Sequence, residues 1–262
     1  MGLSFREYLA LSQPIDLPNY TLSNLLSETQ DVFLQFLESF KPYSFFQEYL
    51  QEGYYPFLLD QKDTAYQRLN QLIRQIIEVD LAELDGFDSK NARKLLHLLT
   101  VISYSVPFKP NISELANKTG IHRNTIPNYF VYLEQARLIH LLYPSILTTA
   151  TLQKPEKIYL NNPTLAFALS SNPDMGNLRE AFALSMLKEN SIVSQSKTSD
   201  FIVDERYTFE IGGKNKSNKQ VKDTQQGWRI VDNQAAPISN KIPLWMLGFL
   251  FNKKIGLKIL ND

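Results

Sequence analysis

The chain contains no cysteine and only three histidines, which narrows the chemistry that its 262 residues can carry. Without cysteine, disulfide bonds, thiolate metal sites and cysteine nucleophiles are excluded. The three histidines, His97, His122 and His140, are too few for a histidine-rich metal site. A metal ion would therefore have to be bound by carboxylates.

Long apolar runs are also missing. The longest one near the C-terminus, residues 244–251, has eight residues, whereas a helix that spans a bilayer needs about 20. Arg6 and Glu7 interrupt the early apolar stretch, so no signal peptide is predicted. The hydrophobic fraction of 44% and the charged fraction of 21% are ordinary for a globular protein and exclude disorder and coiled coil. We expect a cytoplasmic protein that does not enter a membrane.

The formal net charge of zero hides an uneven distribution along the chain. Residues 1–89 carry 5 Lys and Arg against 14 Asp and Glu, a net charge of −9. Residues 90–160 carry 9 basic and 3 acidic residues, a net charge of +6, and residues 161–262 have a net charge of +3. A basic block of this kind indicates either that the segment faces a polyanion or that it packs against the acidic block within one molecule.

The first segment, residues 1–89, has the apolar spacing of amphipathic helices. Apolar residues recur every three or four positions between 21 and 50 and again between 63 and 84. Pro14, Pro18 and Pro42 separate the helices. The pattern predicts an acidic helical bundle without residues that suggest chemistry.

Residues 90–160 have the pattern of a helix-turn-helix. A helix that starts at Asn111 ends at Gly120, and a second helix follows after a short turn. Pro127 fixes the start of the second helix, because proline is tolerated only in the first helical turn. Asn124 is therefore predicted as its N-cap. Extended segments at 138–143 and 157–160 would add the hairpin of a winged helix.

The outward face of this second helix carries residue types that contact phosphates and base edges. They are Arg123, Asn124, Thr125, Asn128 and Tyr132. We predict that they bind DNA. Units of three helices also serve purely as protein-docking domains, so both alternatives remain open.

The last segment, residues 161–262, carries paired acidic residues on two predicted strands, 200–203 and 207–211. If the connecting loop has three residues, Asp200 lies opposite Glu210 with Cβ atoms about 5 Å apart. Both carboxylates would then hold one divalent cation such as Mg²⁺. If the loop has two residues, Glu210 turns to the other face and the pair is lost.

After Glu210 come two glycines and Lys214, which would stabilise developing negative charge. This Asp–Glu–Lys order resembles restriction-endonuclease-like nucleases, whose pattern ends in Glu-x-Lys. The residue two positions after Glu210 is Gly212, and Lys214 stands two positions further on. The alternative is a solvated basic loop on a catalytically inactive scaffold.

Several segments together resemble one family, the prokaryotic AAA-type ATP-binding proteins that carry a C-terminal domain of unknown function. The similar segments, in chain order, are LSFREYLAL, YYPF, the RNT-containing helix with YLEQARLI, KIYLNNPTL, Glu180 and EIGGKNK. The resemblance implies an α+β chain with an acidic helical region over 1–89 that is similar to an ATPase lid, a winged helix-turn-helix over 90–160, and a restriction-endonuclease-like domain with a mixed sheet over 161–262. It also implies that Glu180, Asp200 and Glu210 occupy the nuclease-like acidic positions, with Lys214 an approximate match.

The ATPase signature of that family, G-x-x-x-x-G-K-[ST], is absent from this chain. Without the glycine-rich loop and its lysine, nothing binds the β- and γ-phosphates of ATP. The chain resembles the part that follows the nucleotide-binding core, so no ATP site is predicted, and Mg²⁺ is the one cofactor considered.

Three hypotheses follow for function. The first is a DNA-binding module of an ATPase, the second a protein-interaction scaffold with a degenerate nuclease fold, and the third a Mg²⁺-dependent nuclease that uses Asp200 and Glu210. The partners implied are DNA, a protein partner or the ATPase domain itself. We rank the DNA-binding module first, because fold resemblance alone does not establish catalysis.

Overall fold

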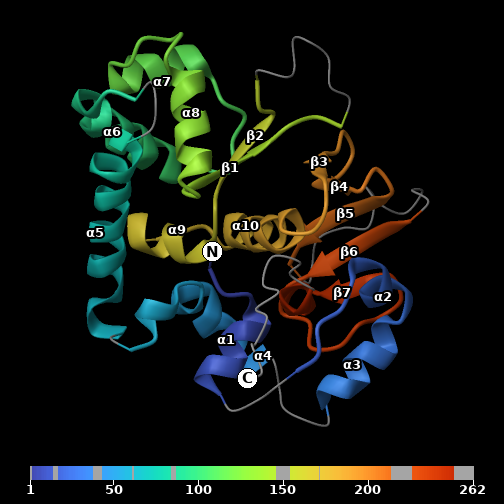
Figure 1. The fold of residues 1–262 in the computed structure, drawn as a ribbon. Helices are drawn as coiled ribbons and strands as arrows, with labels where there is room; N and C mark the ends of the chain where they lie inside the picture. The colour runs from blue at the N-terminus through green and yellow to red at the C-terminus, as the bar shows by residue number, and fades with distance from the viewer. Residues whose placement is uncertain are drawn as a thin grey trace, which may run out of the picture.

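The computed structural model describes residues 2–13, 17–37, 43–60, 62–83, 87–145, 154–170, 172–213 and 226–250. The chain has a mixed α+β architecture with a two-stranded sheet and a five-stranded sheet. Helices α9 (Pro163–Leu169) and α10 (Met175–Lys188) lie between a group of helices and the larger sheet (Figure 1). The expected α+β class is thereby confirmed.

The N-terminal part is helical, as the apolar spacing predicted. A capping box at Ser4 and Glu7 starts the first helix, because each side chain accepts a hydrogen bond from the backbone N–H of the other residue. The elements are α1 (Phe5–Ser12), α2 (Leu22–Ser27), α3 (Thr29–Leu37), α4 (Tyr43–Glu48) and a π-helical turn, Tyr49–Gly53.

The larger sheet has the strand order β3-β4-β5-β6-β7. Strands β3, β4 and β5 are antiparallel, whereas β5, β6 and β7 are parallel to one another. A 3-10 helix, Leu244–Phe249, follows the last strand and is entirely buried. The strands are β3 (Val193–Gln195), β4 (Phe201–Val203), β5 (Tyr207–Gly212), β6 (Gly227–Val231) and β7 (Lys241–Pro243).

Aromatic side chains join the N-terminal helices to this sheet in one core. The rings of Phe36 and Phe249 lie 4.5 Å apart, and Phe36 also meets Trp245 edge-on at 5.2 Å. Gly248 has no room for a side chain, because a Cβ atom there would lie 2.4 Å from Cβ of Phe5. Helices α1 to α4 thus pack on the C-terminal sheet and 3-10 helix as part of a shared core.

The other helices build a second core around the two-stranded sheet. Strands β1 (Ile139–Leu142) and β2 (Lys157–Leu160) form an antiparallel hairpin. Phe108 pairs with Ile158 as an isolated antiparallel bridge at the free edge of β2. The helices are α5 (Ala65–Glu78), α6 (Ala92–Ser103), α7 (Ile112–Thr119) and α8 (Ile126–Gln135), with short 3-10 turns at 56–58, 62–64, 80–83 and 89–91.

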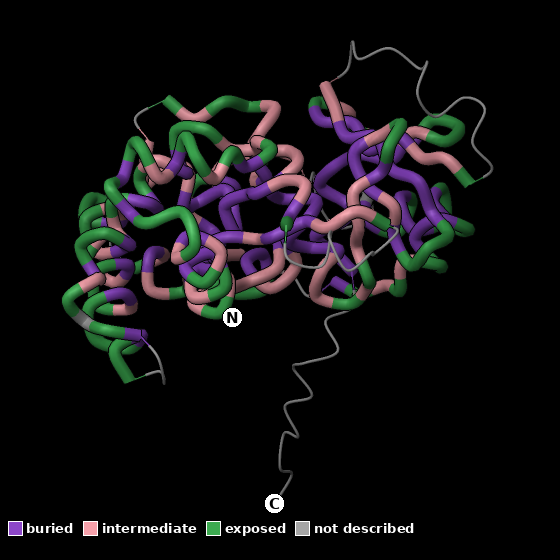
Figure 2. The backbone as a smooth tube through the Cα atoms, turned by 90° about the horizontal axis from the view of Figure 1, so that it is seen from above, coloured by how far each residue is buried: buried purple, intermediate pink, exposed green. Residues whose placement is uncertain are grey.

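The two cores divide the chain differently from the predicted segment boundary at residue 89. Residues 5–54 contribute to the core of the larger sheet, whereas residues 58–87 contribute to the core around α6 and α8. The expected acidic bundle is therefore split between two lobes. Figure 2 shows buried backbone inside both lobes and exposed segments on the outer turns. The bundle is split because the apolar faces of α1–α4 pack against strands of the larger sheet, which lie far away in the sequence.

A buried polar network joins the two cores. The hydroxyl of Tyr54 donates to Oδ1 of Asn161 at 3.2 Å, and Nδ2 of Asn161 lies 3.2 Å from Nε2 of His140. Burial, together with the nearby Lys188 and Arg137, lowers the pKa of His140 to about 3. The ring is therefore neutral, and Nε2 accepts the hydrogen bond from the Asn161 amide.

Within the described ranges, no helix is both long enough and apolar enough to cross a membrane.

Candidate functional site

The start of α8 presents an exposed polar surface to solvent. Arg123, Asn124 and Asn128 are exposed, and Thr125 is half-buried. Their positions follow from the turn before them, in which the N–H of Thr125 donates to the carbonyl of His122 at 2.8 Å. Four of the five predicted DNA-contacting residues therefore lie together at one helix end.

The predicted helix start was one residue too early. Helix α8 begins at Ile126 with Thr125 as its N-cap, and Pro127 is the second helical residue. Asn124 instead belongs to the turn, where its N–H donates to Nδ1 of His122 at 3.3 Å. The preceding α7 is as predicted, because Asn111 caps it and Gly120 ends it in the left-handed conformation with φ of 67°.

Tyr132, the fifth predicted contact residue, does not lie free on the outer face. Its ring meets Phe87 edge-on at 5.3 Å and lies 6.3 Å from the ring of Tyr129. The side chain is half-buried in this aromatic cluster. Its contact with DNA therefore stays a prediction, and the contact with Phe87 could not be read from spacing, because Phe87 lies outside the helix-turn-helix segment.

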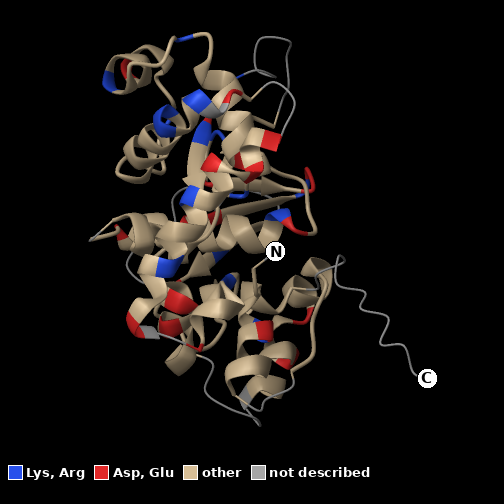
Figure 3. Ribbon diagram, turned by 60° about the vertical axis from the view of Figure 1, so that its left-hand side comes forward, with Lys and Arg blue, Asp and Glu red and all other residues tan. Residues whose placement is uncertain are grey.

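The same aromatic cluster brings further basic residues alongside α8. Phe87 directly precedes the turn and helix start that carry Lys90, Arg93 and Lys94, all exposed. None of these three, nor Arg123, makes an ion pair with another described residue. Lys and Arg are numerous over this part of the molecule, whereas the lower part of the view carries mostly Asp and Glu (Figure 3). This basic surface has its charge available for a partner.

Part of the acidic segment packs against the basic one, because residues 58–87 share a core with α6 and α8, but no ion pair found among the described residues joins the two segments. Lys118 pairs with Glu114 at 2.7 Å within α7, and Arg137 pairs with Glu189 at 3.4 Å at the end of α10. The ion pairs found for the middle segment join it to itself or to α10 and its cap. The excess positive charge is thus not neutralised by them.

The strands that carry the acidic residues have the register of the three-residue alternative. Val203 pairs with Tyr207 and Phe201 with Phe209, as a three-residue loop requires. Both side chains are buried, with 8% and 2% of their surface exposed. The three-residue loop is confirmed, but the paired register ends at Phe201 and Phe209, and Asp200 lies just outside β4 with its N–H bonded to Phe209, so the direct opposition of Asp200 and Glu210 stays a prediction.

Asp200 uses its carboxylate to bind the backbone of the neighbouring strand. Its Oδ2 atom accepts a hydrogen bond from the N–H of Ile211 at 2.7 Å. Its own N–H donates to the carbonyl of Phe209 at 3.1 Å, just outside β4. The carboxylate thus takes the place of a backbone carbonyl as the acceptor for β5 beyond the end of β4, and so helps to hold the two strands together.

Glu210 has a buried arginine directly opposite it on the next strand. Arg229 is 4% exposed, and the parallel register of β5 and β6 pairs it with Glu210 on the same sheet face. Removing a charge from water costs several kcal/mol unless an opposite charge compensates it. A guanidinium here supplies the positive charge that a metal ion would supply, and it would repel a cation bound to Glu210.

Glu180 of α10 is engaged by the hairpin. It accepts a hydrogen bond from the hydroxyl of Tyr159 at 2.8 Å, and Nζ of Lys157 lies 3.7 Å from the same carboxylate oxygen. Burial, and then the negative charges of Glu180 and Asp200, raise the pKa of Tyr159. Glu180 and Asp200 are thus both near Tyr159, but the described part of the chain contains no group of three or more metal-type ligands.

Lys214, the predicted catalytic lysine, lies outside the described residues. The last residue described before it, Gly213, lies against Arg179, because a Cβ atom there would be 3.3 Å from Nη1 of that arginine. Nε of Arg179 donates to Oδ2 of the buried Asp232 at 2.7 Å. Sequence reasoning missed Arg179, Arg229 and Asp232 as members of this charged region, because the parallel pairing of β5 with β6 joins residues distant in sequence.

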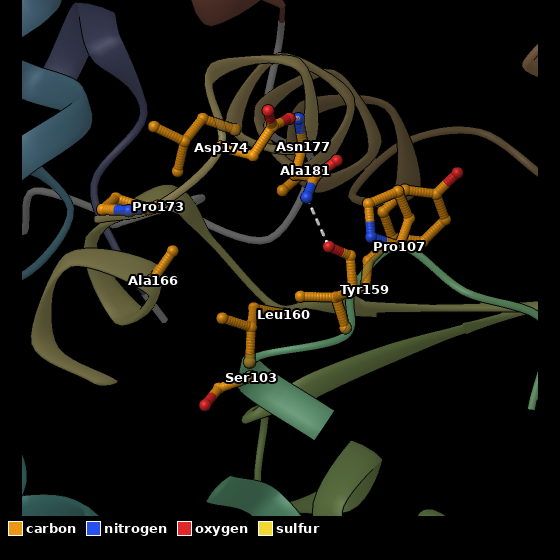
Figure 4. Close-up of a pocket in the computed structure, with 11 residues that line it drawn as sticks. Ser103, Pro107, Tyr159, Leu160, Ala166, Pro173, Asp174, Asn177 and Ala181 are labelled. Carbon is orange, nitrogen blue, oxygen red and sulfur yellow. Dashed lines mark hydrogen bonds between the residues drawn. The ribbon is translucent and has the colours of Figure 1, made fainter. Parts of the chain in front are cut away.

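A small cavity between α6, β2, α9 and α10 is too small for a ligand. Its volume is about 30 Å³, whereas sites for small molecules measure about 300–1,000 Å³. Asn177 closes it by donating from Nδ2 to the carbonyl of Val106 (Figure 4). The cavity therefore belongs to the junction between α10 and the second core.

This chain matches one family model and is distantly similar to one protein of known sequence. The family model of a domain of unknown function, DUF8612, matches residues 44–176, just over half of the chain. The uncharacterized protein MJ1637 of Methanocaldococcus jannaschii is 27% identical over 165 residues, which cover 60% of this chain and 34% of the relative. The chain thus spans about a third of the length of the curated relative that it matches. No solved structure matches it.

Proposed function

The chain belongs to the family of the domain of unknown function DUF8612, and we propose that it binds nucleic acid, contacting duplex DNA through the start of α8. The observation that carries the proposal is the cluster of exposed residues Arg123, Asn124 and Asn128 beside basic side chains that have no ion-pair partner among the described residues. Arginine and asparagine are the side chains that bind guanine and adenine edges in the major groove. Lysines and arginines around them neutralise phosphates.

The order of elements supports a winged helix-turn-helix over this segment. Helix α6, the bridge at Phe108, helices α7 and α8, and the hairpin β1–β2 follow one another as in that motif. In a helix-turn-helix, the N-terminal residues of the second helix reach the base edges. This assigns base contacts to Arg123 and Asn128, and phosphate contacts to Lys90, Arg93 and Lys94.

We also propose that the larger sheet has a restriction-endonuclease-like fold. We further propose that the chain is related to the part of AAA-type proteins that follows their ATPase core. A helix, three antiparallel strands and a parallel fourth strand, α10 to β6, support the first proposal. The chain would then act as the DNA-binding portion of such an ATPase, in the cytoplasm.

The test is a titration of labelled duplex DNA with the full chain. Arg123→Ala and Asn128→Ala are expected to weaken binding by about 1–3 kcal/mol each, the usual worth of a good base contact. Arg74→Ala is the matched control, because Arg74 is equally exposed but lies on α5. Equal binding by all variants at low salt would remove the proposal.

A second candidate function is a protein-interaction scaffold whose nuclease-like sheet is degenerate. The buried Arg229 opposite Glu210 favours it, because the residues present do not suit a divalent cation. Capture of a protein partner in a fixed ratio, unaffected by added DNA, would favour this role over DNA binding.

The third candidate, a Mg²⁺-dependent nuclease that uses Asp200 and Glu210, is the least supported. Asp200 already binds the Ile211 amide, and Glu210 faces Arg229 in the register of the sheet. The donor set therefore does not fit the ion, and we derive no catalytic step from it. Cleavage of plasmid or single-stranded DNA that needs Mg²⁺ and is lost in Glu210→Gln would contradict this conclusion.

A further inference from the structure

The outward side of α8 carries a row of exposed residues without charge. Asn128, Val131 and Gln135 are exposed, and their spacing of three and four residues places them on one side of the helix. The opposite side packs into the second core, where Ile126 and Phe130 are buried. The core therefore fixes which side of α8 faces solvent. We call the three exposed residues the α8 row.

The middle of the α8 row is apolar. Val131 has 45% of its surface exposed and stands between the two amides of the row. Glu134 is the only charged residue of α8, and it contacts other elements. Its Oε1 atom accepts a hydrogen bond from the N–H of Leu141 at 3.0 Å and lies 3.2 Å from Nζ of Lys188. The row thus presents one apolar side chain between two amides, with no charge of its own.

Positive charge lies alongside this uncharged row. Lys90, Arg93 and Lys94 are exposed at or just before the start of α6, a region that the contact of Phe87 with Tyr132 brings next to α8. Duplex DNA has the matching arrangement, because charged phosphates border the major groove and uncharged base edges form its floor. Phosphate contacts fix the position of a protein on the duplex, and contacts to base edges recognise the sequence. The arrangement of charge therefore favours DNA over a protein as the occupant of the α8 row.

The spacing along α8 agrees with that of neighbouring base pairs. Asn128 and Val131 are three residues apart, which is about 4.5 Å along a helix axis, and successive base pairs are about 3.4 Å apart. An asparagine amide pairs with N6 and N7 of adenine, and an apolar side chain contacts the 5-methyl group of thymine. Both of these base edges belong to A·T pairs and face the major groove. The two side chains thus suit an adenine and a thymine of the same or of adjacent base pairs.

We propose that the α8 row recognises A·T base pairs in the major groove of duplex DNA, with Val131 in contact with the 5-methyl group of a thymine. Asn128 binds the adenine of the same or of the adjacent pair, and Gln135 extends the uncharged surface towards the end of the helix. Val131 is then a specificity-determining residue, because a G·C pair offers no methyl group at this position. The inference rests on the proposed DNA binding and adds to it the class of sequence that is bound.

The experiment selects bound sequences from a pool of short duplexes of random sequence with the full chain. A·T pairs should be enriched in the bound fraction. The enriched duplex is then made with deoxyuridine in place of thymine, which removes only the 5-methyl groups. The wild type should bind the deoxyuridine duplex about fourfold more weakly for each methyl group that it contacts, since burying one such group contributes about 0.8 kcal/mol.

Two variants assign this difference to Val131. Val131→Ala should lose most of the difference, because alanine lacks the two methyl groups of valine that would cover the thymine methyl. Leu34→Ala is the matched control, since Leu34 has 56% of its surface exposed but lies on α3 in the other lobe, and its replacement should leave the difference unchanged. Both side chains are exposed, so both variants should melt at the temperature of the wild type.

The outcomes separate this inference from the proposed function. Equal binding of the two duplexes by the wild type, or a difference that persists in Val131→Ala, would refute the inference and leave duplex binding in place. If Val131→Ala binds both duplexes as the wild type does but no longer captures a protein partner, the α8 row is a protein contact and the inference is wrong. Absence of any duplex binding would remove the inference together with the proposed function.

Discussion

Acidification should destabilise the folded chain through His140, whose ring is held neutral in the network between the two cores. The pKa of this histidine is about 3 in the folded chain, against about 6.5 in an unfolded one. Between these two pH values the histidine is protonated in the unfolded chain but neutral in the folded chain. The contribution of His140 to the free energy of unfolding is therefore fully present above about pH 6.5 and is lost progressively as the pH falls towards 3. Protonation would also put a hydrogen on Nε2 of His140, which in the neutral ring accepts a hydrogen bond from Nδ2 of Asn161. Two donors would then face each other.

The expected loss can be worked out from these two values. One pH unit corresponds to about 1.4 kcal/mol per group, so lowering the pH from about 7.5 to about 4.5 should cost about 2–3 kcal/mol through His140 alone. Carboxylates titrate in the lower part of the same range, and a matched variant must separate the two contributions.

Urea unfolding at the two pH values measures this loss. His140→Gln keeps an acceptor for Asn161 but has no proton to gain, so it should lose about 2–3 kcal/mol less than the wild type on acidification. His97→Gln is the control, because His97 is exposed and its replacement should leave the wild-type loss unchanged. An equal loss in all three proteins would refute the reasoning.

Three further substitutions test the shared core, the buried charge of the larger sheet and the left-handed end of α7. Phe36→Ala should cost about 3–5 kcal/mol in unfolding free energy, because the ring is completely buried against Trp245 and Phe249; a loss below about 1 kcal/mol would show that the shared core is wrong. Arg229→Met should cost about 3–5 kcal/mol by leaving Glu210 without its opposite charge, and the double variant with Glu210→Gln should recover most of that loss in the same urea assay. Gly120→Ala should cost about 1 kcal/mol, because φ of 67° disfavours a side chain although the space is open; an unchanged melting temperature would contradict this.

Local features of the fold were predictable from the sequence. Helix α7 between Asn111 and Gly120 follows from capping chemistry, whereas the sequence left two registers of β4 with β5 open and the structure has that of the three-residue turn. These signals act within a few residues of the position they determine.

Features that depend on distant residues were not predictable. The packing of α1–α4 on the sheet, and the contact of Phe87 with Tyr132, join segments that no local pattern connects. The same holds for Arg229, since only the parallel pairing of β5 with β6 brings it opposite Glu210. The two acidic residues could therefore be assigned to this part of the sheet from the sequence, but not the arginine opposite Glu210.

The salt dependence of duplex binding tests the central proposal most directly. The full chain and the Arg123→Ala variant are titrated with one DNA duplex at two salt concentrations, with and without Mg²⁺. The expected result is binding that weakens steeply with salt in both proteins, with lower affinity but an unchanged log–log slope in Arg123→Ala, because Arg123 contacts a base. Binding that is absent at low salt, or that is the same at both salt concentrations in both proteins, would contradict the account.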